Sequence, residues 1–101
     1  MRIIAGKFKN KKIIQPKDKL TRPLKDITKE SIFNILEHSK FIKINVENSR
    51  VLDLFSGSGS FGLECISRGS KDVVFCENYI KVINILERNI ENIGCTKNTQ
   101  V

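Results

Sequence analysis

The feature that most constrains the fold of this 101-residue chain is the stretch VLDLFSGSGSFGLECISRG at residues 51–69. A short apolar run leads into closely spaced glycines, and a segment of helical character follows. Glycines at such a turn allow positive φ angles and let the backbone approach a ligand closely. The stretch therefore predicts a strand over residues 51–55, a glycine loop over 56–60 and a helix over 61–68, arranged to hold a nucleotide-like cofactor.

The segments after this stretch continue the alternation of strand and helix. Residues 72–76 (DVVFC) are apolar except for Asp72, as in a strand buried within a parallel sheet. Residues 79–93 repeat isoleucine and leucine at steps of three and four, which predicts a helix that Gly94 ends. This order defines a right-handed βαβ unit of the α/β class, with a third strand expected to begin at about residue 99.

The first third of the chain has a different character. Residues 2–15 (RIIAGKFKNKKIIQ) contain two short runs with Ile or Phe around an Asn-Lys turn, which predicts a basic β-hairpin. Residues 16–23 form a polar connector with proline at both ends. Residues 25–38 predict an amphipathic helix, and its apolar positions are Leu24, Ile27, Ile32, Ile35 and Leu36.

The positive charge of the chain is concentrated in this first third. Residues 1–29 carry ten lysines or arginines against two aspartates, whereas residues 30–101 carry eight basic and nine acidic groups. A polyanion is therefore the expected partner of the N-terminal end only, and a solubilising basic tail is the alternative. No apolar run suggests a membrane span or a secretory signal, and the three cysteines fit neither a disulfide framework nor a metal site. We expect a cytoplasmic protein with reduced thiols and no metal.

Three features converge at the carboxyl ends of the two predicted strands. Asp53 lies late in the first strand, the loop Gly57-Ser58-Gly59 follows it, and Glu77 closes the second strand. Ligands of parallel α/β sheets bind at this edge, where helix N-termini expose unpaired N–H groups. A carboxylate at the position of Glu77 can accept hydrogen bonds from the vicinal hydroxyls of a ribose.

The loop admits two interpretations. The sequence GSGSFG at residues 57–62 fits the dinucleotide motif G-x-G-x-x-G, with Glu77 about twenty residues further on. Asp53 argues against a dinucleotide, because a carboxylate there would repel a pyrophosphate but suits the ammonium group of a methionine moiety, directly or through water. The expected cofactor is therefore cationic, most simply S-adenosylmethionine. A purely structural role for Asp53, in which it caps the N–H groups of the loop, is the alternative.

Three linked motifs resemble the RsmD-type bacterial small-subunit (16S) rRNA guanine-N2 methyltransferases. They are the opening RIIAGKFKNKKI, the stretch TRPLKDITKESIFNIL at residues 21–36, and DLFSGSGSFGLECISRG at residues 53–69. The resemblance implies a partial class I methyltransferase Rossmann-like fold, with residues 24–101 as the N-terminal half of that domain and residues 1–23 as an RNA-facing hairpin and connector. It also implies S-adenosylmethionine as cofactor, a guanine exocyclic amine as acceptor, and ribosomal RNA or the small ribosomal subunit as partner of a monomeric complete protein.

The same resemblance implies roles for individual residues. Glu77 would hold the ribose of S-adenosylmethionine and Asn78 would face its adenine. The full expected cofactor-binding set is Asp53, Phe55, Gly57, Ser58, Gly59, Glu77 and Asn78. The expected RNA-binding set is Arg2, Lys7, Lys9, Lys11, Lys12, Arg22 and Lys25.

One motif of that family has no counterpart here. Its members carry Asn or Asp followed by Pro-Pro and Phe or Tyr, which grip the guanine amine and stack on the flipped base. The only prolines of this sequence are Pro16 and Pro23, so we assign no catalytic residue and expect the later strands of the sheet to be missing. The strand at residues 51–55 should then expose an unpaired apolar edge. A dinucleotide-binding oxidoreductase fragment and a non-enzymatic RNA-binding remnant stay open as alternatives.

Overall fold

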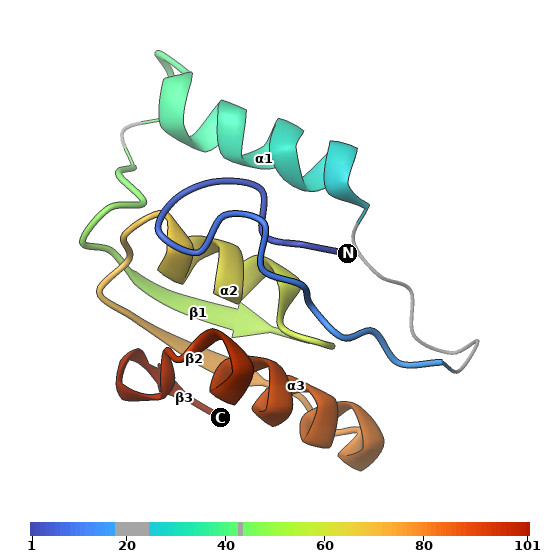
Figure 1. Cartoon of the computed structure of the whole chain (residues 1–101). Helices are drawn as coiled ribbons and strands as arrows, with labels where there is room; N and C mark the ends of the chain where they lie inside the picture. The colour runs from blue at the N-terminus through green and yellow to red at the C-terminus, as the bar shows by residue number, and fades with distance from the viewer. Residues whose placement is uncertain (18–24, 43) are drawn as a thin grey trace.

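The chain alternates helices and strands as the sequence predicts. The computed structural model describes residues 1–17, 25–42 and 44–101. Figure 1 shows its elements in order: α1 (Asp26–His38), β1 (Arg50–Leu54), α2 (Ser60–Ser67), β2 (Asp72–Cys76), α3 (Ile80–Ile93), a short 3-10 turn (Thr96–Asn98) and β3 (Thr99–Gln100). Every helix, and both longer strands, begin and end within one residue of the predicted positions. The α/β fold class is confirmed.

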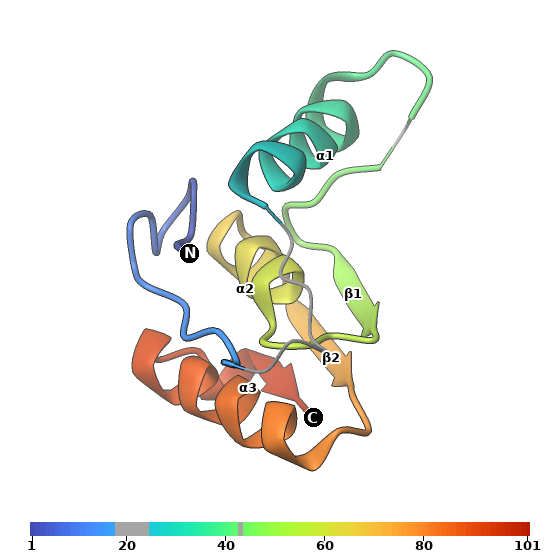
Figure 2. The same ribbon diagram turned by 90° about the vertical axis from the view of Figure 1, so that its right-hand side faces the viewer.

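The three strands form a parallel sheet in the order β1-β2-β3. Figure 2 shows α2 and α3 on the same side of this sheet, as two right-handed crossovers in one direction require. On the opposite face, Leu52 and Leu54 of β1 are 61% and 57% exposed. Within the described residues β1 pairs with β2 alone, so its predicted unpaired apolar edge is confirmed.

The covered face of the sheet carries the main core. Gly62 brings α2 close to β2, because a Cβ on this glycine would lie 2.3 Å from Cε1 of Phe75. Residues from both ends of the chain contribute to the same cluster, so the N-terminal segment is part of the domain core. Its large buried apolar members are Ile3, Ile13, Phe33, Leu63, Ile66, Phe75, Leu86, Ile90 and Ile93.

The N-terminal segment doubles back on itself, as the predicted hairpin requires, but without two extended strands. A single antiparallel bridge joins Arg2 and Lys12, and Asn10 donates its N–H to the Ile3 carbonyl. The physical reason is that part of the intervening backbone bonds to α2 and is not available for a continuous ladder. The N–H groups of Ile4 and Ala5 donate to the Glu64 carboxylate at 2.9 and 3.1 Å.

Helix α1 differs from the prediction in the face that it buries. Ile27 and Ile35 are 81% and 55% exposed, whereas Lys29 and Phe33 are fully buried. The expected apolar stripe is therefore wrong in part, and Leu24 lies outside the described residues. The reason is a polar anchor: the Lys29 ammonium lies 3.3 Å from the buried carboxylate of Glu64 on α2. The orientation of the helix places Lys29 beside this partner, since an unpaired buried charge is costly.

The three cysteines are free thiols, as predicted. Burial raises the pKa of Cys65 to about 12, and neighbouring carboxylates add to the effect, so this thiol stays protonated and unreactive. Burial also raises the pKa of Cys95. Across the described ranges, no helix is long and apolar enough to cross a bilayer.

Candidate cofactor site and basic segment

The loop between β1 and α2 has the backbone geometry of a ligand cradle. Phe55, Gly57 and Gly59 all have positive φ, at 58°, 58° and 92°. At Gly59, the N-cap of α2, a Cβ would lie 2.4 Å from Cδ1 of Leu86, so only glycine fits. At Gly57 a Cβ would meet no atom within 4 Å. The space beside Gly57 is therefore open, and a ligand can approach the backbone there.

Phe55 carries the most unusual conformation in the loop. Non-glycine residues rarely adopt positive φ, and the conformation costs on the order of 1 kcal/mol. Its aromatic side chain is 91% exposed, so burial of the ring does not offset this cost. Such strain gathers at functional sites, where it holds a side chain in a useful place.

Glu77 links the glycine loop to the start of α3. Its Oε1 accepts the N–H of Gly57 at 2.9 Å, and its Oε2 accepts the N–H groups of Asn78 and Tyr79, each at 3.1 Å. The carboxylate thus fixes both the glycine loop and the two residues that lead into α3. Oε1 accepts only one N–H group and has room for a further donor, so these bonds leave Glu77 able to accept from a ribose hydroxyl.

Asp53 lies behind the loop and not in the open groove. It is 8% exposed, and its Oδ2 accepts the N–H of Gly62 in the first turn of α2 at 3.1 Å. Burial raises the pKa of this carboxyl to about 6; the hydrogen bond from Gly62 opposes the rise, and the charge of Glu77 adds to it. The structure thus contains the alternative role of Asp53, in which its carboxylate accepts a backbone N–H group. The other carboxylate oxygen, Oδ1, takes no part in the bond with Gly62.

A groove of about 450 Å³ runs along the carboxyl ends of the strands. It brings Phe55, Glu77 and Asn78 of the expected set together. Its remaining lining was not predicted and consists of Leu54, Phe75, Cys76 and Val101. The groove is mostly apolar with one carboxylate and no basic side chain, which suits a flat aromatic ring attached to a polar sugar.

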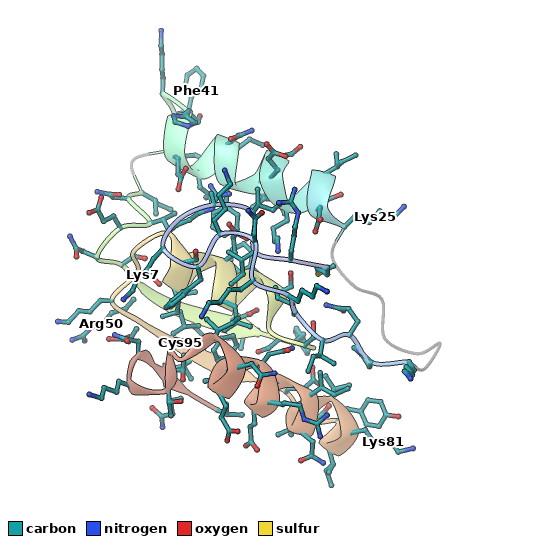
Figure 3. All side chains as sticks on the ribbon, in the orientation of Figure 1. Lys7, Lys25, Phe41, Arg50, Lys81 and Cys95 are labelled. Atoms are coloured by element: carbon teal, nitrogen blue, oxygen red, sulfur yellow. The ribbon has the colours of Figure 1, made fainter. Side chains whose placement is uncertain are left out.

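Most of the expected RNA-binding residues lie on the doubled-back N-terminal segment, where a backbone bridge joins Arg2 and Lys12. Figure 3 places Lys7 beside α2 and Lys25 at the start of α1. The ammonium groups of Lys7 and Lys11 each lie 5.3 Å from the centre of the Phe8 ring, and Lys11 also donates to the Ile93 carbonyl at 3.3 Å. Arg2 bonds to the Asn10 side chain. The side chains of Lys9, Lys12 and Lys25 are exposed, and Arg22 lies outside the described residues.

Two buried polar residues that sequence reasoning missed support the site. Glu64 and Asn89 are both fully buried on helices, and each bonds to the N-terminal segment. The sequence contains a signal for each of these two residues. Glu64 interrupts an apolar helical run, and Asn89 lies in a helix interior, where asparagine is disfavoured unless its side chain has a specific partner.

Strand, glycine loop, helix and second strand, joined in a parallel sheet, define part of a Rossmann-like fold. The protein family described as "Conserved hypothetical protein 95" matches residues 1–101. The chain belongs to this family, which is the RsmD family that its motifs resemble.

Individual relatives carry consistent names. The Haemophilus influenzae ribosomal RNA small subunit methyltransferase D is 35% identical over 96 residues, which are 95% of this chain and 47% of that protein. Bacillus subtilis YlbH, named as an rRNA methyltransferase, is 37% identical over 101 residues, or 52% of its length. The chain thus spans about half the length of the curated relatives it matches.

Solved structures agree with this assignment. The Escherichia coli protein YhhF, named as a methyltransferase, superposes with a TM-score of 0.82 at 28% identity and covers all of this chain and 50% of that one. A hypothetical protein of Thermus thermophilus gives a TM-score of 0.80 at 26% identity, over all of this chain and 53% of that one. The partial Rossmann-like fold is therefore shared with methyltransferase structures.

Proposed function

We propose that this protein takes part in S-adenosylmethionine-dependent methylation of small-subunit ribosomal RNA, with a guanine exocyclic amine as acceptor. The observation that carries the proposal is the apolar, acid-lined groove beside a glycine loop with open space at Gly57. Relatives over the whole chain are named as ribosomal RNA small subunit methyltransferases, which supports the substrate class. When bound, S-adenosylmethionine supplies a sulfonium methyl group that is already activated for transfer.

The residues of the groove fit this donor better than a dinucleotide. Burial is the main cause that raises the pKa of Asp53, and the charge of Glu77 adds to it, so two carboxyl groups of the site oppose further negative charge. None of the groove-lining residues is a lysine or arginine that could neutralise a pyrophosphate. A cationic ligand lowers this repulsion, and a pyrophosphate increases it.

In this proposal each residue has a defined task. Gly57, Ser58 and Gly59 bring the backbone against the methionine moiety, and Asp53 favours its ammonium group, directly or through water. Glu77 accepts hydrogen bonds from the ribose, while Phe55 and Asn78 flank the adenine. The basic side chains of the N-terminal segment and Lys25 face the RNA. Residues 1–23 then form the RNA-facing part, and residues 24–101 the part that binds the donor.

Calorimetry separates this function from the two alternatives. We expect S-adenosylhomocysteine to bind at micromolar concentration and NAD to bind far more weakly. Tighter binding of NAD would replace the proposal with a dinucleotide-binding fragment. Salt-dependent RNA binding without affinity for S-adenosylhomocysteine would indicate a non-enzymatic RNA-binding module.

The acceptor is tested separately. The protein is incubated with S-adenosylmethionine labelled in its methyl group and with a small-subunit ribosomal RNA transcript, and the digested nucleosides are analysed by mass spectrometry. Label in N2-methylguanosine supports the proposed acceptor. Label in a different nucleoside keeps the methyltransferase assignment and overturns the choice of guanine N2.

A further inference from the structure

Asn89 connects three parts of the molecule through one buried side chain. It lies on α3 and is fully buried. Its Oδ1 accepts the N–H of Ile14 at 2.8 Å, and its Nδ2 donates to the carbonyl oxygens of Ile14 and Ser58 at 3.0 and 2.9 Å. A carboxamide has two N–H donors, and both are used here. The side chain therefore has a single orientation that holds residue 14 and the glycine loop together.

A second contact lies beside the first. The Ser58 hydroxyl, in a residue only 5% exposed, lies 3.3 Å from Oε1 of Gln15. Ser58, in the loop that would hold the methyl donor, is thus bonded to Gln15 directly and linked to Ile14 through Asn89. Lys11, Lys12 and Lys17 lie within a few positions of Ile14 and Gln15 along the same segment. We name the contacts among Ile14, Gln15, Ser58 and Asn89 the loop latch.

Most other polar contacts of the N-terminal segment run to α2, and one indirect link passes through the Lys29 ammonium, which bonds both the Arg2 carbonyl and the Ser60 hydroxyl. Ser67, near the end of α2, accepts the N–H of Phe8 at 2.9 Å and donates to the Ala5 carbonyl. Glu64 holds the N–H groups of Ile4 and Ala5. The segment is therefore anchored to α2 at one end and to the donor loop at the other, and the two anchors can be removed independently.

We propose that Asn89 is a positioning residue that couples donor binding at the glycine loop to RNA binding by the N-terminal segment. The inference rests on the proposed function, since it assumes that the loop binds S-adenosylmethionine and that the segment binds RNA. A donor that orders the loop at Ser58 also orders Ile14 and Gln15, so RNA then binds at a lower entropic cost. By linkage, RNA increases the affinity for the donor by the same factor.

The coupling factor is the measurement that tests the latch. The affinity of the protein for a small-subunit ribosomal RNA transcript is measured by fluorescence anisotropy, with and without saturating S-adenosylhomocysteine, and the reverse titration checks reciprocity. We expect a coupling factor of about five or more in the wild type, the range typical of allosteric coupling. In Asn89→Ala the factor should fall to about one, with each separate affinity changed less than the coupling.

Two further variants make the result decisive. Gln15→Ala removes only the outer contact of the latch, so it should reduce the factor even if Asn89→Ala fails to fold. Ser67→Ala removes the side-chain bonds between Ser67 and the segment, far from the glycine loop, and should leave the factor unchanged, which a merely structural role for these bonds does not predict. An unchanged factor in Gln15→Ala or in folded Asn89→Ala overturns the inference, as does a wild type that binds both ligands without coupling. A wild type that binds neither ligand overturns the proposed function itself.

Discussion

At the scale of single residues, Asp53 makes donor binding depend on pH. Burial raises the pKa of its carboxyl to about 6. A cationic donor favours the ionised form, so its binding lowers that pKa and the affinity rises as pH increases through 6. We expect S-adenosylmethionine to bind about tenfold more weakly at pH 5 than at pH 7.5, as measured by calorimetry.

The control for this prediction is Asp53→Asn, which should bind weakly and without the rise near pH 6. The same group gives an independent readout in folding. Because the folded state holds the Asp53 proton more tightly than the unfolded state, the wild type loses stability as pH rises from about 4 to 6. A pH profile of affinity that is equally steep in Asp53→Asn would contradict the assignment of this carboxyl.

Glu77 provides the second residue-scale prediction. Its carboxylate accepts three backbone N–H groups, from Gly57, Asn78 and Tyr79. In Glu77→Gln an amide N–H replaces one accepting oxygen, so one of these donors loses its partner and a ribose hydroxyl loses a charged acceptor. Hydrogen bonds to charged groups contribute about 1.5–3 kcal/mol each, so we expect affinity for S-adenosylhomocysteine to fall tenfold or more.

Glu87→Gln is the matched control for this variant. Glu87 lies on α3, the helix that follows Glu77, and its side chain is exposed. The two variants remove the same charge from neighbouring parts of the chain, so a general effect of net charge would change both affinities equally. A loss in Glu77→Gln no larger than in Glu87→Gln would exclude the ribose-binding role.

At the scale of elements, a buried ion pair joins α1 to α2. The Lys29 ammonium lies 3.3 Å from Oε1 of Glu64 and also donates to the Arg2 carbonyl and the Ser60 hydroxyl. Lys29→Met leaves a buried carboxylate with fewer partners, which should lower the free energy of unfolding by about 3 kcal/mol in urea denaturation. The control Arg50→Met breaks an exposed pair with Asp72, and it should cost less than about 1 kcal/mol. Equal losses in both variants would show that the buried pair does not stabilise α1.

Hydrophobic pattern predicted where the elements lie but not which face of α1 is buried. In residues 51–93 the spacing of the apolar residues specifies strands and helices directly, because apolar runs and three-to-four-residue steps are typical of a parallel βαβ unit. In α1 the periodic isoleucines Ile27 and Ile35 are exposed, and Lys29 is buried in their place. A lysine on a helix usually indicates a solvated face, and its partner Glu64 lies 35 positions away. Such a pairing depends on tertiary structure, so local pattern does not contain it.

The candidate site likewise has one part that the local sequence predicts and another part that depends on tertiary structure. The glycine loop and Glu77 are local signals, and the structure brings Glu77 against Gly57 as topology requires. The rest of the groove is assembled from residues with no individual signal, such as Phe75 and Val101, because they line it only through strand order. The latch residue Asn89 joins positions 75 residues apart, which a single sequence does not connect.

At the scale of the whole molecule, the sheet has one covered and one open face. The helices α2 and α3 and the N-terminal segment lie on one side, and the open side presents the apolar side chains of Leu52 and Leu54 on an edge strand. An exposed apolar edge is a template for pairing with another chain. We therefore predict that a polypeptide of just these 101 residues self-associates at micromolar concentration in sedimentation velocity.

Lysine on an edge strand opposes such pairing through charge and side-chain length. The double variant Leu52→Lys, Leu54→Lys should shift the sedimentation profile from large species to a monomer at the same concentration. Ile35→Lys, at a position 55% exposed on α1, adds charge to an apolar surface away from the sheet and should leave the association largely intact. Equal relief by both variants would assign the association to exposed apolar surface in general. A monomeric wild-type polypeptide with a sharp cooperative thermal transition would contradict the prediction, because the open edge would then carry no cost for the fold.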